Sequence, residues 1–433
     1  MSAISCIVFK LYLLSHIKEG DSLALIIFRD ATLIDGKGGD PLSPATIVVE
    51  DGVIREITVG KFKMTIPADA MIVNCYGKTL LPGLIDAHIH VGLFDGDENE
   101  QPRQNHPSML IIKALKVMED TLYQGFTTCR DAGGVDAGFR EAQKLGLIKG
   151  PRLKVSGRSL SMTGGHGDCR LSTDRRNPYD EILGCSVICD GVSEVRKAAR
   201  EELRRGADHI KVMAGGGCSS PTDEPDACQY SLEELEAIAY EANSAGKYAL
   251  AHCYSNRSVQ NCVKAGIKSI EHGNFMDRET AKLLHDADCW YVPTLTTYEV
   301  MTRKGEEFGI PDYFLRKMKM VYETAIEAVT NAYHEGVVIG SGSDVIGPAQ
   351  PYKAMELELK ARVLGPMGAI VSATRVNSAI LCMDDKVGTI EPGKLADLIV
   401  VDGDPLKEIS LLQDRSRICI IMQGGIFIKN IIN

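Results

Sequence analysis

Two histidines at the end of an apolar run are the clearest chemical feature of this sequence. Residues 80–85 are apolar and lead into Asp86-Ala87-His88-Ile89-His90. Alternate residues of a strand point to the same side, so His88 and His90 should project together from the end of a buried strand. Two imidazoles at this spacing can hold one metal ion. A lone His-x-His pair is weak support for a metal site, so further ligands have to come from elsewhere in the chain.

A lysine inside a second apolar run is a candidate for an unusual ligand. Lys211 lies within the run 209–214, which ends at a stretch of three glycines, 215–217. Burial of an unpaired ammonium group is costly, and a buried lysine tends to lose its proton. The neutral amine can react with carbon dioxide to give a carbamate, an anion able to bridge two cations. The alternative is that Lys211 lies on an edge strand and reaches solvent.

Three more strand-like runs end in residues that bind metals. His252 ends the run 248–252, His272 ends the run 269–272 and Asp344 ends the run 338–344. A single histidine in such a place is more often a hydrogen-bonded core residue than a ligand. Together, however, the chain offers four imidazoles, one potential carbamate and one carboxylate at the carboxyl ends of strand-like runs. Active sites of (β/α)8 barrels are built at those ends.

The order of these motifs resembles that of the amidohydrolase superfamily in its binuclear form. Within it, the sequence is most similar to the prolidase (Xaa-Pro dipeptidase) and ochratoxin amidase branch. The similar stretches are 163–168, 210–214, 251–254 and 271–274, and the resemblance runs from about residue 26 to the end of the chain. It implies a (β/α)8 TIM barrel, with a small β-sandwich domain made from the N- and C-terminal segments.

The resemblance also implies a site with two divalent metal ions, with zinc expected first and manganese or cobalt as alternatives. The more buried ion would be held with the help of Asp344, the more exposed ion by the two later histidines, and a carboxylated Lys211 would bridge them. A bridging hydroxide would attack the amide carbonyl, and Asp344 would pass the proton to the leaving nitrogen. The six expected metal ligands are His88, His90, Lys211, His252, His272 and Asp344.

Four further residues are candidates for contacts with the substrate. His166 and Tyr254 lie in motifs similar to those of the prolidase branch, which implies catalytic or binding contacts to the substrate carbonyl or terminal carboxylate. Both side chains can donate hydrogen bonds to developing negative charge. Arg158 and Tyr298 are weaker candidates for the pocket.

Other polar residues are interpreted as structural. Arg130 and Asp131 are expected to form an ion pair, with a place in the pocket as the alternative, and Trp290 is expected to pack in the core. The remaining histidines considered, interpreted as structural or solvated, are His106, His209, His285 and His334.

Four functions are compared on these grounds. The favoured one is a Xaa-Pro dipeptidase-like metal-dependent hydrolase of small substrates. The alternative in the same branch is an N-acyl amino acid amidase of the ochratoxin-hydrolase type, which differs in the size of its pocket. A non-catalytic scaffold would be expected to lose ligands, and all six are retained. A mononuclear deaminase would have no use for the bridging Lys211.

Composition limits the partners and the location. The chain has 433 residues, of which 44% are hydrophobic and 24% charged, as in ordinary globular enzymes. A net charge of −10 argues against nucleic acid as a partner. Thirteen scattered cysteines suit a reducing compartment, so we expect a cytoplasmic enzyme for a small-molecule substrate. No membrane association is expected, and the resemblance suggests a homo-oligomer.

The chain divides by its patterns into a β-rich part at each end and an α/β middle. We expect a poorly defined extension over 1–22, a β-sandwich from 23–80 and 388–433, and the barrel over 81–387. The Asp51-Gly52 pair predicts a hairpin turn, and helical patterns occupy 192–203 and the segment that follows the N-cap Ser231. Residues 166–190 are expected to form a long loop over the barrel mouth. The glycines at 215–217 lack the Lys-Ser/Thr of a phosphate-binding loop.

Overall fold

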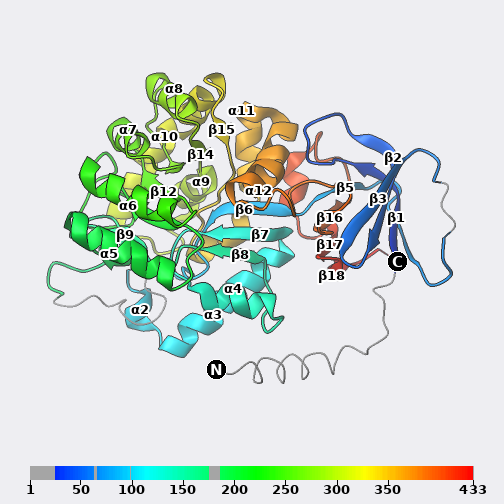
Figure 1. Ribbon diagram of the computed structural model, residues 1–433, viewed down its shortest axis with the longest axis horizontal. Coiled ribbons are helices and arrows are strands. Elements are labelled where there is room, and N and C mark those ends of the chain that lie inside the picture. Colours follow the sequence, from blue (N-terminus) through cyan, green and yellow to red (C-terminus); the bar gives the residue numbers. More distant parts are fainter. Residues whose placement is uncertain (1–24, 63–65, 98, 175–185, 433) are drawn as a thin grey trace.

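The computed structural model of the protein describes residues 25–62, 66–97, 99–174 and 186–432. The predicted extension over 1–22 and part of the predicted long loop lie outside these residues. Figure 1 shows a barrel surrounded by helices, with a β-rich unit beside it at one end. In the described part of the chain, no helix combines the length and apolar character that crossing a membrane requires.

The barrel is a ring of parallel strands. The sheet β6-β7-β8 contributes three of them, and β9 with β11 to β15 continues the ring in the second sheet, where Asp208 N donates to Val155 O (2.7 Å). Strand β10 pairs with β9 at the edge of this second sheet and lies within the stretch predicted as a loop. Two backbone hydrogen bonds close the ring between its last and first strands: Ala87 N donates to Ser341 O (2.8 Å) and Asp344 N to His88 O (2.9 Å). The strands of the two sheets are β6 (Leu84–Ile89), β7 (Phe126–Asp131), β8 (Arg152–Val155), β9 (Ser159–Ser161), β10 (Ser186–Ile188), β11 (Ile210–Met213), β12 (Ala249–Cys253), β13 (Ser269–His272), β14 (Trp290–Val292) and β15 (Val338–Ile339).

Helices cover the outside of this ring because alternate strand residues face them. On β11, Ile210 and Val212 belong to the apolar core shared with the helices, whereas Lys211 and Met213 line the pocket within the barrel. The predicted Ser231–Glu234 capping box is present at the start of α6. The helices are α2 (Gln101–Gln104), α3 (Pro107–Tyr123), α4 (Ala137–Lys144), α5 (Gly191–Arg204), α6 (Leu232–Ser244), α7 (Asn256–Lys264), α8 (Arg278–Asp286), α9 (Leu295–Lys304), α10 (Asp312–His334), α11 (Met355–Val371) and α12 (Asn377–Ile380).

Both ends of the chain contribute to a second, smaller unit. Its strands follow the order β18-β17-β16-β5-β1-β2-β3, with β4 paired to β1. Phe28 on β1 and Phe427 on β18 have ring centroids 6.2 Å apart although three strands separate them in the sheet, so the sheet folds over its own core. The strands are β1 (Ile26–Leu33), β2 (Leu42–Glu50), β3 (Val53–Val59), β4 (Met71–Asn74), β5 (Thr79–Pro82), β16 (Leu398–Val401), β17 (Ile418–Gln423) and β18 (Ile426–Asn430).

The expected fold class, a TIM barrel with a β-sandwich from both termini, is therefore confirmed. The predicted turn at Asp51-Gly52 joins β2 to β3, and both residues have the positive φ (50° and 79°) that tight hairpin turns require. Only Gly83 separates β5 from β6, so the two units are directly connected. The exact domain boundaries stay a prediction.

Strand β16 joins the two units through its two faces. Leu398 and Val400 pack in the core of the sandwich, whereas Ile399 and Val401 belong to the cluster that contains Phe126 and other residues of the barrel. All four β16 side chains are buried, which explains why this strand is apolar without alternation.

Replacement of Ile399 by alanine should destabilise the protein by removing contacts between the two units. A buried isoleucine truncated to alanine typically costs about 2–5 kcal/mol, and Ile399 is fully buried. Denaturation by urea, followed by circular dichroism, measures the effect. The matched control is Ile426→Ala on β18, a side chain that is 61% exposed and should change stability by less than about 0.5 kcal/mol. Equal effects would mean that Ile399 does not join the units.

Candidate active site

A pocket at the carboxyl ends of the barrel strands brings together most of the residues singled out in the sequence. It also includes apolar residues such as Leu93 and Met318. Each of the six expected metal ligands lines it, as do His166 and Tyr254. Residues far apart in the chain thus meet at one end of the barrel, as strand-end residues of this fold do.

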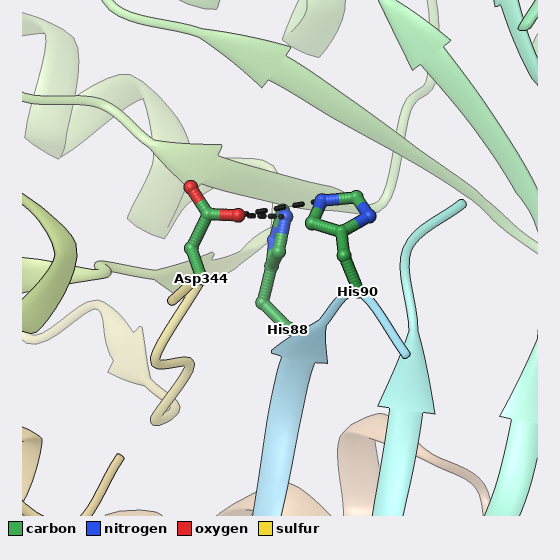
Figure 2. A group of neighbouring side chains, drawn as sticks. All are labelled: His88, His90 and Asp344. Carbon is green, nitrogen blue, oxygen red and sulfur yellow. Dashed lines mark ion pairs between the residues drawn. The ribbon is translucent and has the colours of Figure 1, made fainter. Parts of the chain in front are cut away.

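Asp344 and the two histidines of the first strand form the tightest group. Asp344 Oδ1 lies 3.5 Å from His88 Nε2 and 3.3 Å from His90 Nε2 (Figure 2). Ligand atoms of these three residues all lie within 4.8 Å of one another, a spacing compatible with a shared metal ion. The ring of His272 is next to this group, with its centroid 4.8 Å from that of His88, and the ring of His252 follows at 4.5 Å from His272.

Hydrogen bonds fix which ring nitrogen of each of the four histidines carries a proton. Nδ1 of His90 donates to Gly133 O (2.8 Å) and Nε2 of His252 donates to Gly216 O (3.0 Å), because a carbonyl can only accept. For the same reason Nδ1 of His88 donates to a carboxylate, that of Glu271, at 2.7 Å.

In His272, Nδ1 contacts Thr294 Oγ1 at 2.8 Å, and that hydroxyl gives its own hydrogen to Tyr298. Nδ1 of His272 is therefore the donor. In the neutral form of each of the four rings, the second nitrogen keeps a lone pair, as metal ligation requires. Burial lowers the pKa of His90, but the Asp344 carboxylate outweighs this effect and raises that pKa above its usual value.

One of these lone pairs has no partner within the protein. Nε2 of His88 is buried and makes no hydrogen bond to any described residue. A buried polar atom left unsatisfied is destabilising unless a ligand completes it. Burial also lowers the pKa of His88 well below its usual value, so the ring is neutral. The arrangement fits a metal ion bound between His88, His90 and Asp344.

Lys211 lies in the middle of the ring of strands and not at an edge. Strand β11 is hydrogen-bonded to β9 on one side and β12 on the other, so the solvent-exposed alternative considered for Lys211 is wrong. The side chain is 1% exposed. Burial lowers the pKa of Lys211 to about 8, against the raising effect of the Glu271 and Asp344 carboxylates. Roughly a tenth of the amine is therefore neutral at pH 7, far more than for an ordinary lysine, and carbamate formation needs this neutral form.

Two of the ligand candidates have a backbone conformation that L-residues rarely adopt. His272 has φ of 72° and Asp344 φ of 50°. Strain of this kind persists where the surrounding structure imposes it, commonly at functional sites. At His272 it also breaks the alternation of β13, so that His272 lines the pocket while its neighbour Glu271 still reaches His88 inside the barrel.

His166 is fixed by the loop that follows β11. Its Nδ1 contacts Ser220 Oγ at 3.0 Å, and Ser220 gives its only hydrogen to the carboxylate of Asp223. Nδ1 of His166 is therefore protonated, and the neutral ring presents Nε2 as an acceptor. Burial, with the Lys211 and Lys317 ammonium groups, lowers the pKa of His166 to about 3, which favours that neutral form. The hydrogen-bond donor expected of His166 from the sequence is thus not supplied by the free nitrogen.

Tyr254 brings a phenol hydroxyl into the pocket. Its ring lies 4.8 Å from that of His252 and 5.5 Å from that of His272. Its oxygen accepts from Tyr298 at 3.2 Å, which leaves its own hydrogen available. Burial raises the pKa of Tyr254 well above its usual value, so it stays protonated. Tyr298 supports Tyr254 from behind and does not itself line the pocket.

Several other residues lie away from the places that the sequence indicated. Arg158 is outside the pocket lining, because its guanidinium pairs with Glu202 of α5 at 2.9 Å. The expected ion pair between Arg130 and Asp131 is wrong: Arg130 pairs with Glu271, and Asp131 accepts from the backbone of Val91 and Gly133. Neighbouring strand residues point to opposite sides, which keeps Arg130 and Asp131 apart.

The other residues interpreted as structural are placed as follows. His209 is buried and bonded to Asp131 O, whereas Trp290 is only partly buried, with the Lys268 ammonium 5.0 Å from its ring. Among the described histidines, those exposed to solvent are His106, His285 and His334.

Comparison with known proteins assigns this site to a family. The model of the amidohydrolase family matches residues 79–426, which include the whole barrel. The chain belongs to the amidohydrolase family. It is 31% identical over 439 residues to ochratoxinase from Aspergillus niger, an alignment that covers 95% of this chain and 88% of that protein. This amidohydrolase is therefore a hydrolytic enzyme, and its family generally depends on two metal ions.

Solved structures agree with the assignment. A crystal structure of an amidohydrolase has a TM-score of 0.90 and 38% identity to this chain, with 95% of this chain and 100% of the other covered. A prolidase complexed with N-methylphosphonate-L-proline has a TM-score of 0.90 and 36% identity, covering 94% and 100%. Both likenesses extend over the barrel and the sandwich.

Gly217→Ala should lower the activity of the amidohydrolase by displacing His166. A Cβ at Gly217 would lie 2.0 Å from His166 Nδ1 and Cε1, far inside contact distance. A shift of about 1 Å in a group that contacts substrate can reduce turnover by up to ~10²-fold. Steady-state kinetics measures the loss, and metal content should be unchanged. Gly39→Ala is the control, because a Cβ there meets nothing within 4 Å; a silent Gly217→Ala would show that the His166 position is unimportant.

Proposed function

We propose that this amidohydrolase hydrolyses the peptide bond of Xaa-Pro dipeptides with the help of two divalent metal ions. The observation that carries the proposal is one pocket lined by four histidines, Asp344 and the buried Lys211, in which the ligand atoms of His88, His90 and Asp344 lie within 4.8 Å of one another. The similar prolidase that binds an N-methylphosphonate of proline supports the choice of substrate class. The 31% identity to A. niger ochratoxinase supports a second candidate, an N-acyl amino acid amidase.

In this proposal the six ligands divide between two ions. His88 and His90 hold the more buried ion together with Asp344, and His252 and His272 hold the other. Lys211, as its carbamate, would complete the set of residues that holds the two ions. Zinc is proposed as the metal, because imidazole and carboxylate ligands suit it well. When bound, such ions polarise the scissile carbonyl and lower the pKa of a water molecule towards neutrality.

Residues of the chain itself transfer the proton to the leaving nitrogen and orient the substrate. Asp344 faces the pocket, with its side chain 19% exposed, so its carboxylate can take a proton and return it to the leaving nitrogen. Tyr254 offers its hydroxyl hydrogen to the substrate oxygen or carboxylate. His166, with Nε2 as an acceptor, is suited to a hydrogen bond from the free amino group of a dipeptide.

The proposal also includes a cytoplasmic location and a homo-oligomeric assembly. The described cysteines form no disulfide with one another, which supports a reducing compartment such as the cytoplasm. A homo-oligomer is proposed from the family resemblance, and light scattering in solution tests it.

Lys211→Ala should abolish most metal binding and activity, since it removes the bridging anion. Short carboxylic acids such as propionate should restore part of the activity by occupying the vacated space, whereas propylamine should not. Metal content by atomic emission and turnover with and without each additive measure both effects. A fully active Lys211→Ala enzyme would contradict the binuclear carbamate arrangement.

Asp344→Asn should separate the role of Asp344 in proton transfer from its role in metal binding. The amide keeps the shape and one ligand oxygen but cannot carry a proton. Turnover should fall by roughly 10²–10⁴, the usual contribution of general acid–base catalysis, and further if metal is lost. Metal content is measured on the same preparation, so the two causes can be told apart. Near-normal turnover would mean that another group protonates the leaving nitrogen.

Substrate choice tests the dipeptidase proposal directly. If the leaving amino acid is recognised by its free carboxylate, C-terminally amidated dipeptides should be cleaved much more slowly than free acids. Tyr254→Phe removes one hydroxyl and no ligand, so it should reduce kcat/KM while metal content stays unchanged. Equal cleavage of acids and amides, with a silent Tyr254→Phe, would favour the N-acyl amino acid amidase instead. A panel of Xaa-Pro dipeptides and N-acyl amino acids decides between the two.

A further inference from the structure

A buried ion pair lies inside the barrel directly beneath the first histidine of the pocket. Arg130 on β7 and Glu271 on β13 are both fully buried, as is His88 on β6. Barrel interiors are normally filled by layers of apolar side chains. A guanidinium and a carboxylate in this position therefore call for an explanation.

Several contacts of the pair lead towards His88, while Arg130 also donates to Tyr248 and Ser269, and Ser269 donates to Glu271. Arg130 donates to both carboxylate oxygens of Glu271, each at 2.8 Å, and the same carboxylate accepts the Nδ1 hydrogen of His88 at 2.7 Å. Nε of Arg130 also donates to the carbonyl of Ala87, the residue just before His88. The pair thus fixes both the ring and the backbone of His88.

Stability alone does not account for the pair. Buried ion pairs are often no more stabilising than apolar residues of similar volume, because both charges must be removed from water. The bond to Glu271 has a chemical effect instead. It places the proton of His88 on Nδ1 and turns the lone pair of Nε2 towards Asp344 Oδ1, 3.5 Å away. A carboxylate bonded in this way also makes an imidazole a stronger metal ligand.

We propose that Arg130 and Glu271 are positioning residues for the metal centre, acting through His88. Glu271 holds His88 in the tautomer and orientation that ligation needs, and Arg130 holds Glu271 in place. The inference rests on the proposed role of His88 as a metal ligand. It assigns a function to two residues that touch neither metal nor substrate.

The test is the metal affinity of the protein after both charges are removed together. The double variant Glu271→Leu/Arg130→Met keeps the volume of the layer and leaves no unpaired charge. We expect its affinity for Zn²⁺ to fall by about 10–100-fold, the usual effect of removing a partner of a ligand histidine. Competition with a chromophoric chelator measures the affinity, and the visible spectrum of the Co²⁺-loaded protein should change.

A second variant separates the hydrogen bond from the charge. In Glu271→Gln/Arg130→Met, the amide oxygen can still accept from His88 Nδ1, so the affinity should lie between those of the parent and the apolar variant. If the apolar variant does not fold, as judged by circular dichroism, the metal affinity of Glu271→Gln/Arg130→Met alone tests the inference. An affinity equal to that of the parent would then overturn the role of the carboxylate.

The matched control is another buried ion pair, Glu356 and Lys360, which lies outside the pocket lining with Nζ 3.3 Å from Oε1. Glu356→Leu/Lys360→Met should bind Zn²⁺ as the parent does. Parental affinity in the Glu271 and Arg130 variants, or an equal loss in the control, would overturn the inference. A parent protein that binds no metal would instead refute the proposed function.

Discussion

The geometry of the site depends on how its histidines are anchored. Each of the four rings gives one N–H to an acceptor of the protein, and three of those acceptors are a backbone carbonyl or a carboxylate, which cannot donate in return. The fourth, the Thr294 hydroxyl, has its hydrogen committed to Tyr298. The tautomer of each neutral ring is thereby decided before any ligand arrives, so binding need not turn the rings.

Helix α10 fixes the position of another pocket residue, His166, in a similar way. Lys317 is buried and donates to Ser220 O at 2.7 Å, and Ser220 in turn holds His166. Met318, the next residue of α10, lines the pocket itself. Helix α10 therefore forms part of the pocket wall through Met318, and through Lys317 it holds the loop that orients His166.

Much of the fold and of the pocket could be predicted because the relevant signals are local. His88 and His90 follow strand alternation, and runs such as the one ending at His252 mark strand ends. The partners of these residues could not be predicted in the same way. Glu271 next to His272 should point away from it, and only the positive φ of His272 allows both side chains to act on the same site. Likewise, the pairing of Arg158 with Glu202 depends on how α5 lies against the barrel, which spacing along the chain does not encode.

The joining of the two chain ends in one sheet has a consequence for synthesis. Strand β5 pairs with β1 on one side and with β16 on the other, and Lys78 meets Asp402 across 324 residues of sequence. While the barrel is being translated, one edge of β5 has no partner, although its Leu80 and Leu81 are fully buried in the finished protein. Open apolar edges of this kind invite pairing with other chains. Nascent protein that stalls before β16 should therefore need a chaperone, however complete its barrel.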